Sequence, residues 1–210
     1  MTESRADTVF RLLHKHYGTV KPGLEYSDIY QLTIAVVLSA QTTDKQVNKI
    51  TPVLFSKYPD FCSLQSADIT EIEGIVKSTG FFRTKASNIV RLARCICLDY
   101  DGKVPDKIEE LIKLPGVGRK SANVILAQGH NIPGLAVDTH VKRLSQRLGL
   151  STGKEPDKIE KDLKNIYSEK LWSEVHLLLI HHGRNKCHAR KPECITCPVR
   201  DLCNSPDKNF

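Results

Sequence analysis

The sequence predicts an all-α fold, and two observations support this prediction. Apolar residues recur at helical spacing in segments around residues 9–16, 69–76, 89–96 and 159–166. Strand-like alternation between hairpin signals is missing, and the one candidate turn, Asp101-Gly102, joins two helical segments rather than two strands. We therefore expect roughly ten short helices joined by short polar connections.

Three helix starts have local signals. Ser66 and Asp138 each precede a helical segment and predict an N-cap, because their side chains can accept hydrogen bonds from free backbone N–H groups. Pro105-Asp106 predicts the start of a third helix, since proline fits the first helical turn. At the other end of the chain, we expect residues 204–210 to fray.

Composition and charge narrow the class of protein. The chain has 210 residues, 40% of them hydrophobic and 26% charged, which is typical of a soluble globular protein with one compact body or two small lobes. No apolar stretch approaches the roughly 18 residues of a membrane span, and the N-terminus lacks a secretory signal. The net charge of +7 indicates either a polyanionic partner or ordinary solubilising charge.

The seven cysteines fall into two groups. Cys62, Cys95 and Cys97 are scattered among apolar residues, and we predict that they are small buried core residues. The other four lie within a short C-terminal segment with the spacing Cys187-x6-Cys194-x2-Cys197-x5-Cys203. An odd number of cysteines in a reducing compartment argues against disulfides.

The C-terminal cysteines predict a metal site. Four thiolates bind either Zn²⁺ or an iron–sulfur cluster, and their spacing alone does not decide between the two. Because four cysteines complete a closed site, the metal is expected to have a structural role. Basic residues surround the cysteines and could contact the phosphates of a polyanion; they are Arg184, Lys186, Arg190, Lys191 and Arg200.

A glycine-containing turn lies between two helical segments, with the sequence Leu114-Pro-Gly-Val-Gly-Arg-Lys120. Proline ends the first helix, and we expect Gly116 and Gly118 to permit positive φ angles and to leave the backbone uncovered. The N–H groups of the second helix, beside Arg119 and Lys120, would then bind a phosphate. The alternative is a plain helix–turn–helix with a solvated basic start.

Lys120 and Asp138 are candidates for chemistry. The helix dipole disfavours a positive charge in the first turn of a helix. It therefore favours the neutral form of a lysine amine at this position, and the neutral amine is the nucleophilic form. A nucleophilic amine with a nearby carboxylate suits attack on a sugar C1′ and the proton transfers that follow. In the alternative interpretation Lys120 is a phosphate contact, Asp138 is only a helix cap and His140 is an ordinary helix histidine.

A faint internal repeat relates residues 75–89 to residues 111–124. Both segments predict a helix, a tight turn and a second helix. In the alignment Gly80 matches Gly116, and Lys85 matches Lys120. Coincidence between two amphipathic helix pairs is the alternative explanation.

With these features, the chain resembles the endonuclease III family of DNA glycosylases over nearly its whole length. The motifs that carry the resemblance are Leu38-Ser-Ala-Gln-Thr-Thr-Asp44, Leu114-Pro-Gly-Val-Gly-Arg-Lys120, Ala136-Val-Asp-Thr-His140, His182-Gly-Arg184 and the four-cysteine spacing. The resemblance implies a six-helix barrel at residues 22–132, with a helix–hairpin–helix motif at about 107–128. It also implies a second lobe, of residues 1–21 plus 133–210, that holds a [4Fe–4S] cluster.

The resemblance further implies an active site in the cleft between the lobes. Lys120 matches the family's Schiff-base nucleophile, and Asp138 matches its essential carboxylate. The cluster ligands would be Cys187, Cys194, Cys197 and Cys203. Related adenine glycosylases and mismatch thymine glycosylases lack a lysine at this place, so Lys120 favours the bifunctional branch.

The implied function is that of a bifunctional DNA glycosylase and AP lyase of base excision repair. It would remove oxidised or ring-saturated pyrimidines through a lysine Schiff base and cut 3′ to the site by β-elimination. Its partner would be double-stranded DNA with damaged bases or abasic sites, bound by a cytoplasmic, nucleoid-associated monomer. The alternatives are a monofunctional glycosylase and a non-catalytic DNA-binding module with a structural metal.

The resemblance also assigns DNA contacts. Gln41 would fill the hole left by the flipped base, and Phe81 stands where the family places an apolar wedge, although the adjacent Phe82 could be the ring that enters the helix. The complete set of expected DNA contacts is Gln41, Phe81, Leu114, Gly116, Gly118, Arg119, His140, Arg184 and Lys191.

Overall fold

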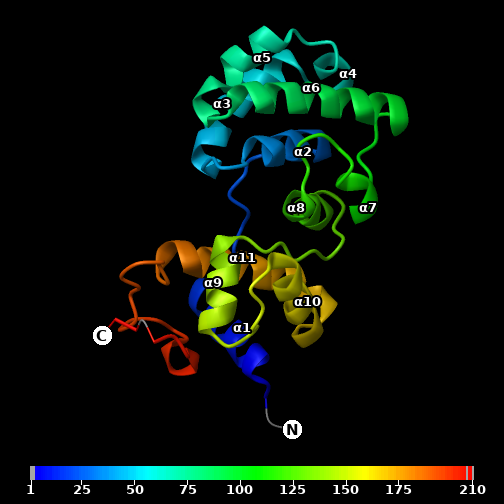
Figure 1. Cartoon of the computed structure of the whole chain (residues 1–210). Helices are drawn as coiled ribbons and strands as arrows, with labels where there is room; N and C mark the ends of the chain where they lie inside the picture. Colours follow the sequence, from blue (N-terminus) through cyan, green and yellow to red (C-terminus); the bar gives the residue numbers. More distant parts are fainter. Residues whose placement is uncertain (1–2, 207, 210) are drawn as a thin grey trace. The chain divides into compact units, whose positions relative to one another are not determined.

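The computed structural model describes residues 3–206 and 208–209, and every regular element in this part of the chain is a helix (Figure 1). The prediction of an all-α fold is therefore confirmed. The chain divides into two compact units, each with its own apolar core. Unit 1 combines Met1–Lys21 with Pro133–Phe210, and unit 2 comprises Pro22–Ile132.

Unit 2 is built around an apolar central helix, α2. Eight of the ten residues of α2 are buried, because a helix that is apolar on all sides needs neighbours on all sides. Helices α3, α6 and α8 pack against it. The elements of unit 2 are α2 (Ile29–Leu38), α3 (Asp44–Lys57), α4 (Phe61–Leu64), α5 (Ile69–Val76), η1 (Lys77–Thr79), α6 (Phe82–Asp99), α7 (Ile108–Leu111) and α8 (Arg119–Gly129).

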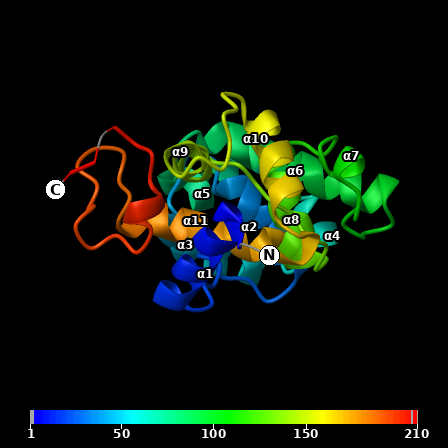
Figure 2. The same cartoon turned by 90° about the horizontal axis from the view of Figure 1, so that it is seen from below.

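Unit 1 is built around α11, which packs between α1 and α9. After α11 the chain continues as an irregular loop, drawn from orange to red in Figures 1 and 2, and this loop carries the four C-terminal cysteines. The elements of unit 1 are α1 (Arg5–Tyr17), α9 (Thr139–Arg147), α10 (Pro156–Ile166), η2 (Glu169–Leu171), α11 (Trp172–Asn185) and η3 (Arg200–Leu202).

Two predicted helix starts are wrong by two or three residues. The N-cap before α5 is Asp68 and not Ser66, because the Asp68 carboxylate accepts the N–H of Thr70 at 2.7 Å. Helix α7 begins at Ile108, so Pro105-Asp106 lies in the preceding loop. Local side-chain signals therefore locate these helices but do not fix their first residue.

The prediction that three cysteines are buried core residues is wrong for Cys62 and only partly right for Cys95 and Cys97, which pack against the core of unit 2. Cys62 is exposed, and Cys95 and Cys97 are only partly buried, with the Cys62 and Cys97 sulfurs 3.5 Å apart. Their apolar sequence neighbours point inward at other positions of the same helices.

The C-terminal tail makes specific contacts where the structure describes it. Asn204 N donates to Arg147 O at 2.7 Å, and Asn209 N donates to Cys194 Sγ at 3.3 Å. The prediction that residues 204–210 fray is wrong for these two residues, while Asp207 and Phe210 lie outside the described residues. In the described part of the chain, no helix is both long and apolar enough to cross a membrane.

Candidate functional site

The glycine-containing turn connects α7 to α8, where the sequence predicts a hairpin. Leu114 and Val117 anchor the turn in the core of unit 2, and Val117 N donates to Leu114 O at 3.1 Å. Gly116 has φ +79°, and a Cβ there would lie only 3.0 Å from both Val37 and Asn88. Glycine is therefore required at this position both by conformation and by space.

Gly118 differs from the prediction. Its φ is −93°, which any residue can adopt, and a Cβ would meet nothing within 4 Å. Gly118 is the N-cap of α8 and offers no side chain to bond the first N–H groups of that helix. Its role is therefore to leave this helix start open, where Arg119 and Lys120 are both exposed. An open helix N-terminus with basic neighbours is a suitable site for a phosphate.

Two other loops of unit 2 expose residues in left-handed backbone conformations. Gln41 has φ +54° in the loop between α2 and α3, and Phe81 has φ +47° just before α6. Phe81 is 67% exposed, whereas Phe82 packs against the core of unit 2. Exposed, strained non-glycine residues are uncommon and typical of functional sites. Of the two rings, Phe81 is thus the one available to an external partner.

Asp138 is the N-cap of α9. Its Oδ1 accepts the backbone N–H groups of His140 at 2.8 Å and Val141 at 2.9 Å, while Oδ2 lies 3.3 Å from His140 Nδ1. Its side chain is only 11% exposed. The cap fixes one carboxylate oxygen against the backbone, so the second oxygen is the one that could serve a reaction.

The segment before Asp138 is also held firmly. Residues 134–137 are buried, and the buried His176 of α11 bonds Ala136 O through Nδ1 at 2.8 Å. Within unit 1, His140 packs on Gly183, where a Cβ would lie 2.9 Å from the His140 Cβ. The glycine of the His182-Gly-Arg184 motif therefore permits close approach of α9 to α11.

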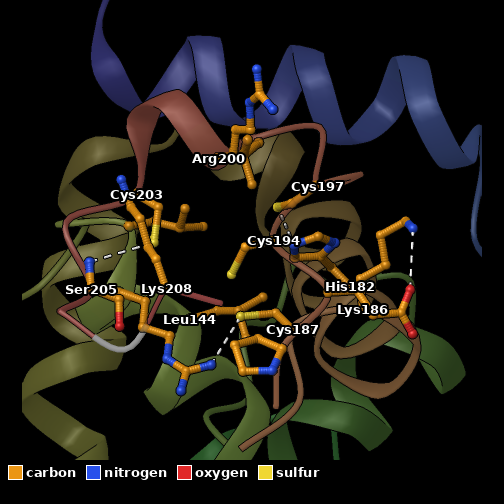
Figure 3. A pocket seen from close by; sticks show the side chains of 15 residues that line it. Leu144, His182, Lys186, Cys187, Cys194, Cys197, Arg200, Cys203, Ser205 and Lys208 are labelled. Atoms are coloured by element: carbon orange, nitrogen blue, oxygen red, sulfur yellow. Dashed lines mark hydrogen bonds and ion pairs between the residues drawn. The ribbon is translucent and has the colours of Figure 1, made fainter. Parts of the chain in front are cut away.

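The four C-terminal cysteines line one cavity of about 470 Å³, part of it open to solvent. Their sulfurs point toward a common space (Figure 3), and none forms a disulfide. Tight turns position the later cysteines: Cys197 N donates to Cys194 O, and Cys203 N donates to Arg200 O. The loop thus directs four sulfurs into one cavity (Figure 3).

Each of these sulfurs has a nitrogen within hydrogen-bond distance. Cys187 Sγ accepts from Arg147 Nη1 at 3.3 Å, and Cys197 Sγ lies 3.5 Å from His182 Nε2. Cys194 Sγ and Cys203 Sγ accept the backbone N–H groups of Asn209 at 3.3 Å and Ser205 at 3.5 Å. Such donors stabilise anionic sulfur, so the set fits thiolate ligands of a metal cluster.

The pKa shifts of the groups in the cysteine cavity also fit a bound metal. Burial raises the pKa of the Cys197 thiol, and the neighbouring Cys187, Cys194 and Cys203 raise it further. Four thiolates so close together require cations between them, which a bound metal would supply. Burial also lowers the pKa of His182 to about 4, so its imidazole is neutral near pH 7. Its Nδ1 lies 2.8 Å from the Tyr17 hydroxyl; in the tautomer in which Nδ1 accepts from that hydroxyl, Nε2–H faces Cys197.

The remaining predicted contacts differ in how exposed they are. Arg184, near the end of α11, is exposed, and so is Lys191, which lies in the cysteine loop with φ +51°. The side chain of Leu114 is only 2% exposed, so any external contact there is limited to its backbone. His140 is partly buried beside Asp138.

Sequence reasoning missed two sets of residues around these features. Arg143 and Arg147 of α9 bond the cysteine loop, with Arg143 Nη2 donating to Gly183 O at 2.9 Å and Cys187 O at 2.8 Å. Lys85 is buried in unit 2. The internal repeat aligned Lys85 with Lys120 but gave no signal that one is buried and the other exposed.

Comparison with known proteins places these features in a family. Residues 34–169 match the model of the HhH-GPD superfamily base excision DNA repair proteins, and residues 187–203 match the iron–sulfur binding domain of endonuclease III. Endonuclease III of Synechocystis sp. is 48% identical over 204 residues, which cover 97% of this chain and 93% of the relative.

Solved structures agree with the sequence comparisons. A non-covalent endonuclease III–DNA complex is 38% identical, with a TM-score of 0.90 over 97% of this chain and 96% of the other. A trapped endonuclease III–DNA covalent intermediate has the same identity and TM-score over 97% of both chains. The chain therefore belongs to the HhH-GPD superfamily and, within it, to the endonuclease III family of DNA glycosylases and AP lyases.

Family membership confirms the predicted class of function, a bifunctional glycosylase and lyase of base excision repair. It also confirms the [4Fe–4S] cofactor and decides against zinc, since the matched domain at residues 187–203 is an iron–sulfur domain. The donor set described above fits this assignment, because it supplies four thiolates and a nitrogen beside each.

Proposed function

We propose that this protein binds double-stranded DNA with damaged bases or abasic sites, and that Lys120 is its nucleophile. The observation that carries the proposal is an exposed lysine in the first turn of α8, whose N-cap glycine leaves the helix start open. The same feature offers a phosphate site and an amine on adjacent residues. A structural relative that was trapped as a covalent intermediate with DNA supports covalent chemistry of this kind.

Phosphate binding would position the damaged strand. The backbone of Gly116 and Gly118, the N–H groups at the start of α8 and the Arg119 side chain would bind one DNA phosphate. Such contacts fix register without reading sequence, as suits an enzyme that must act at any position. Arg184 and Lys191 are proposed as additional phosphate contacts from unit 1, and their exposure supports this role.

The proposed reaction begins with a base outside the helical stack, because the reacting C1′ is inaccessible within it. Gln41 and Phe81 would occupy the space that the base leaves. Neutral Lys120 Nζ then attacks C1′, the N-glycosidic bond breaks, and the base leaves with a proton. Oxidised or ring-saturated pyrimidines are the proposed substrates, in line with the family resemblance.

The second half of the reaction cuts the strand. Opening of the sugar ring gives a Schiff base between Lys120 and C1′, which acidifies the C2′ proton. Loss of that proton breaks the C3′–O bond by β-elimination, and water releases the lysine. We propose that the Asp138 carboxylate stabilises the positive charge near C1′ and takes part in proton transfer.

We also propose that residues 22–132 form the family's six-helix barrel, and that residues 1–21 plus 133–210 form its iron–sulfur domain. The cluster would be held by Cys187, Cys194, Cys197 and Cys203. When bound it provides a closed, structural cross-link of the loop, with no coordination position open to substrate. The chain's own residues therefore carry all steps of the reaction.

Borohydride trapping tests the proposal. The protein is incubated with a duplex that carries one abasic site, borohydride is added, and the covalent protein–DNA product is measured on a denaturing gel. Lys120→Ala should abolish the product, while Lys113→Ala, which removes an exposed lysine of the same hairpin, should retain it. A product that persists in Lys120→Ala would overturn the assignment.

A duplex with 5,6-dihydrothymine, a ring-saturated pyrimidine, tests the substrate class. Base release followed by strand cleavage at that position would support it. If the base is released but no trapped product forms, the enzyme is monofunctional and Lys120 is a phosphate contact.

A further inference from the structure

Unit 2 contains a buried lysine that the proposed reaction does not use. The side chain of Lys85, in the first turn of α6, is 4% exposed. In the part of the chain that the structure describes, no carboxylate lies within ion-pair distance of its Nζ. Burial lowers its pKa, since nothing nearby compensates the charge. Burial of a lysine without a paired carboxylate costs folding free energy, which its hydrogen bonds offset only in part.

The hydrogen bonds of Lys85 join two loops. Its Nζ donates to Thr42 Oγ1 at 2.6 Å and to Thr79 O at 2.7 Å. Thr42 lies in the loop between α2 and α3, and Thr79 ends η1 just before α6. Thr42 Oγ1 also donates to Thr79 O, so the three groups close a small triangle. A second bridge lies beside it, where Gln46 Nε2 donates to Ser78 Oγ at 2.7 Å.

The residues next to this triangle are the two strained, exposed ones. Gln41 directly precedes Thr42, and Phe81 follows Thr79 after one glycine. Both have positive φ angles, which persist only where surrounding contacts hold the backbone. On the side of the turn, the Lys85 N–H also donates to Phe81 O at 3.0 Å as the first helical bond of α6. On the side of the other loop, Lys85 contacts the Thr42 hydroxyl.

We infer that Lys85 is a positioning residue that fixes the Gln41 loop and the Phe81 turn as one rigid element for insertion into DNA. This inference rests on the proposed roles of Gln41 and Phe81. A flexible pair of loops would have to be ordered at each encounter, and small misplacement of an inserted side chain lowers the rate strongly. A lysine suits this position because its ammonium group has enough donors to hold a hydroxyl and a carbonyl at once.

Two variants break the triangle from different sides. Lys85→Met keeps the length and removes the donors, and burial of methionine in place of an uncompensated charge should leave the protein folded. Thr42→Val removes the hydroxyl at a half-buried position and should also fold. Lys49→Met is the matched control, since it removes one exposed lysine of unit 2 and changes the net charge equally.

Base unstacking is the decisive readout. A duplex carries 2-aminopurine opposite an abasic site, and its fluorescence rises when the base leaves the stack. We expect Lys85→Met and Thr42→Val to lose most of the increase that the wild type and Lys49→Met produce. At saturating protein, the borohydride-trapping rate should fall about tenfold or more in both variants. Thermal unfolding and the absorbance near 400 nm should stay close to the wild type.

Two results would overturn the inference. One is full unstacking and trapping by both Lys85→Met and Thr42→Val. The other is a loss of signal that only parallels a lower melting temperature, which would make Lys85 a structural residue; if Lys85→Met does not fold, Thr42→Val decides. Failure of the proposed function has a different signature, because the wild type would then give no trapped product whatever its 2-aminopurine signal.

Discussion

Arg147 Nη1 donates a hydrogen bond to Cys187 Sγ at 3.3 Å, so the last residue of α9 contacts a proposed ligand of the iron–sulfur cluster. The first N–H groups of the same helix are bonded to Asp138. One short helix thus connects the proposed catalytic carboxylate to the metal loop. Loss of the cluster should release this end of α9 and loosen the helix that Asp138 caps.

Arg147→Met tests that connection. It removes a charge-assisted hydrogen bond to a ligand sulfur, and outer-shell partners of this kind change metal affinity by about 10- to 100-fold. We expect iron release to a chelator, followed by the loss of absorbance near 400 nm, to be about tenfold faster than in the wild type. Arg190→Met, at an exposed position in the same loop, is the control. Equal iron release from both variants would contradict the role of Arg147.

The two roles of Asp138, as a helix cap and as a proposed catalytic group, can be tested separately. Asn is as good an N-cap as Asp, so Asp138→Asn should melt close to the wild type, whereas Asp138→Ala should lose about 1 kcal/mol of stability. If the charge is needed for catalysis, both variants should be slower by about 100-fold or more in strand cleavage. Thermal unfolding and single-turnover cleavage measure the two effects. An Asp138→Asn variant with wild-type cleavage would reduce Asp138 to a helix cap.

Substitution by alanine should have different effects at the two glycines of the hairpin. Gly116→Ala forces a side chain into a left-handed conformation against Val37 and Asn88, and should cost about 2 kcal/mol of stability. Gly118→Ala meets no neighbour, and should cost only about 0.5 kcal/mol while it covers the open start of α8. Denaturant unfolding should therefore single out Gly116, and DNA affinity per folded molecule should single out Gly118. The reverse order in either assay would contradict this division.

The buried Lys85 predicts a pH dependence of stability. Its pKa in the folded protein is lowered from 10.5, so between the folded pKa and about 10.5 the unfolded chain binds more protons than the folded one. The contribution of Lys85 to the free energy of unfolding therefore rises with pH in that window. The free energy of unfolding of the wild type minus that of Lys85→Met should be larger at pH 10 than at pH 7.5. A difference that is constant or falls with pH would show that the Lys85 pKa is not lowered.

The sequence predicted features that depend on spacing and local chemistry. The all-α class, the turn between α7 and α8, the cap at Asp138 and the cysteine cavity all follow from residues close together in the chain. Gly80 and Gly116, which the internal repeat aligned, both have positive φ angles. The signals for these features therefore lie in residues that are near one another in the sequence.

Features that depend on tertiary packing were not predictable in this way. Cys62 lies among apolar residues in sequence but is exposed, because its position on α4 faces outward. Gly118 has an ordinary φ angle, since the neighbouring Gly116 alone makes the turn. The burial of Lys85 and the reach of Arg147 to Cys187 depend on contacts between segments more than thirty residues apart.

The most direct test of the central claim is to locate the covalent bond to DNA. The borohydride-reduced product of the wild-type protein with an abasic-site duplex is digested with protease and nuclease, and the modified peptide is identified by mass spectrometry. The proposed mechanism predicts a single adduct on Lys120, within the hairpin peptide that contains Gly116 and Gly118. An adduct on another lysine or on the N-terminal amine would contradict it.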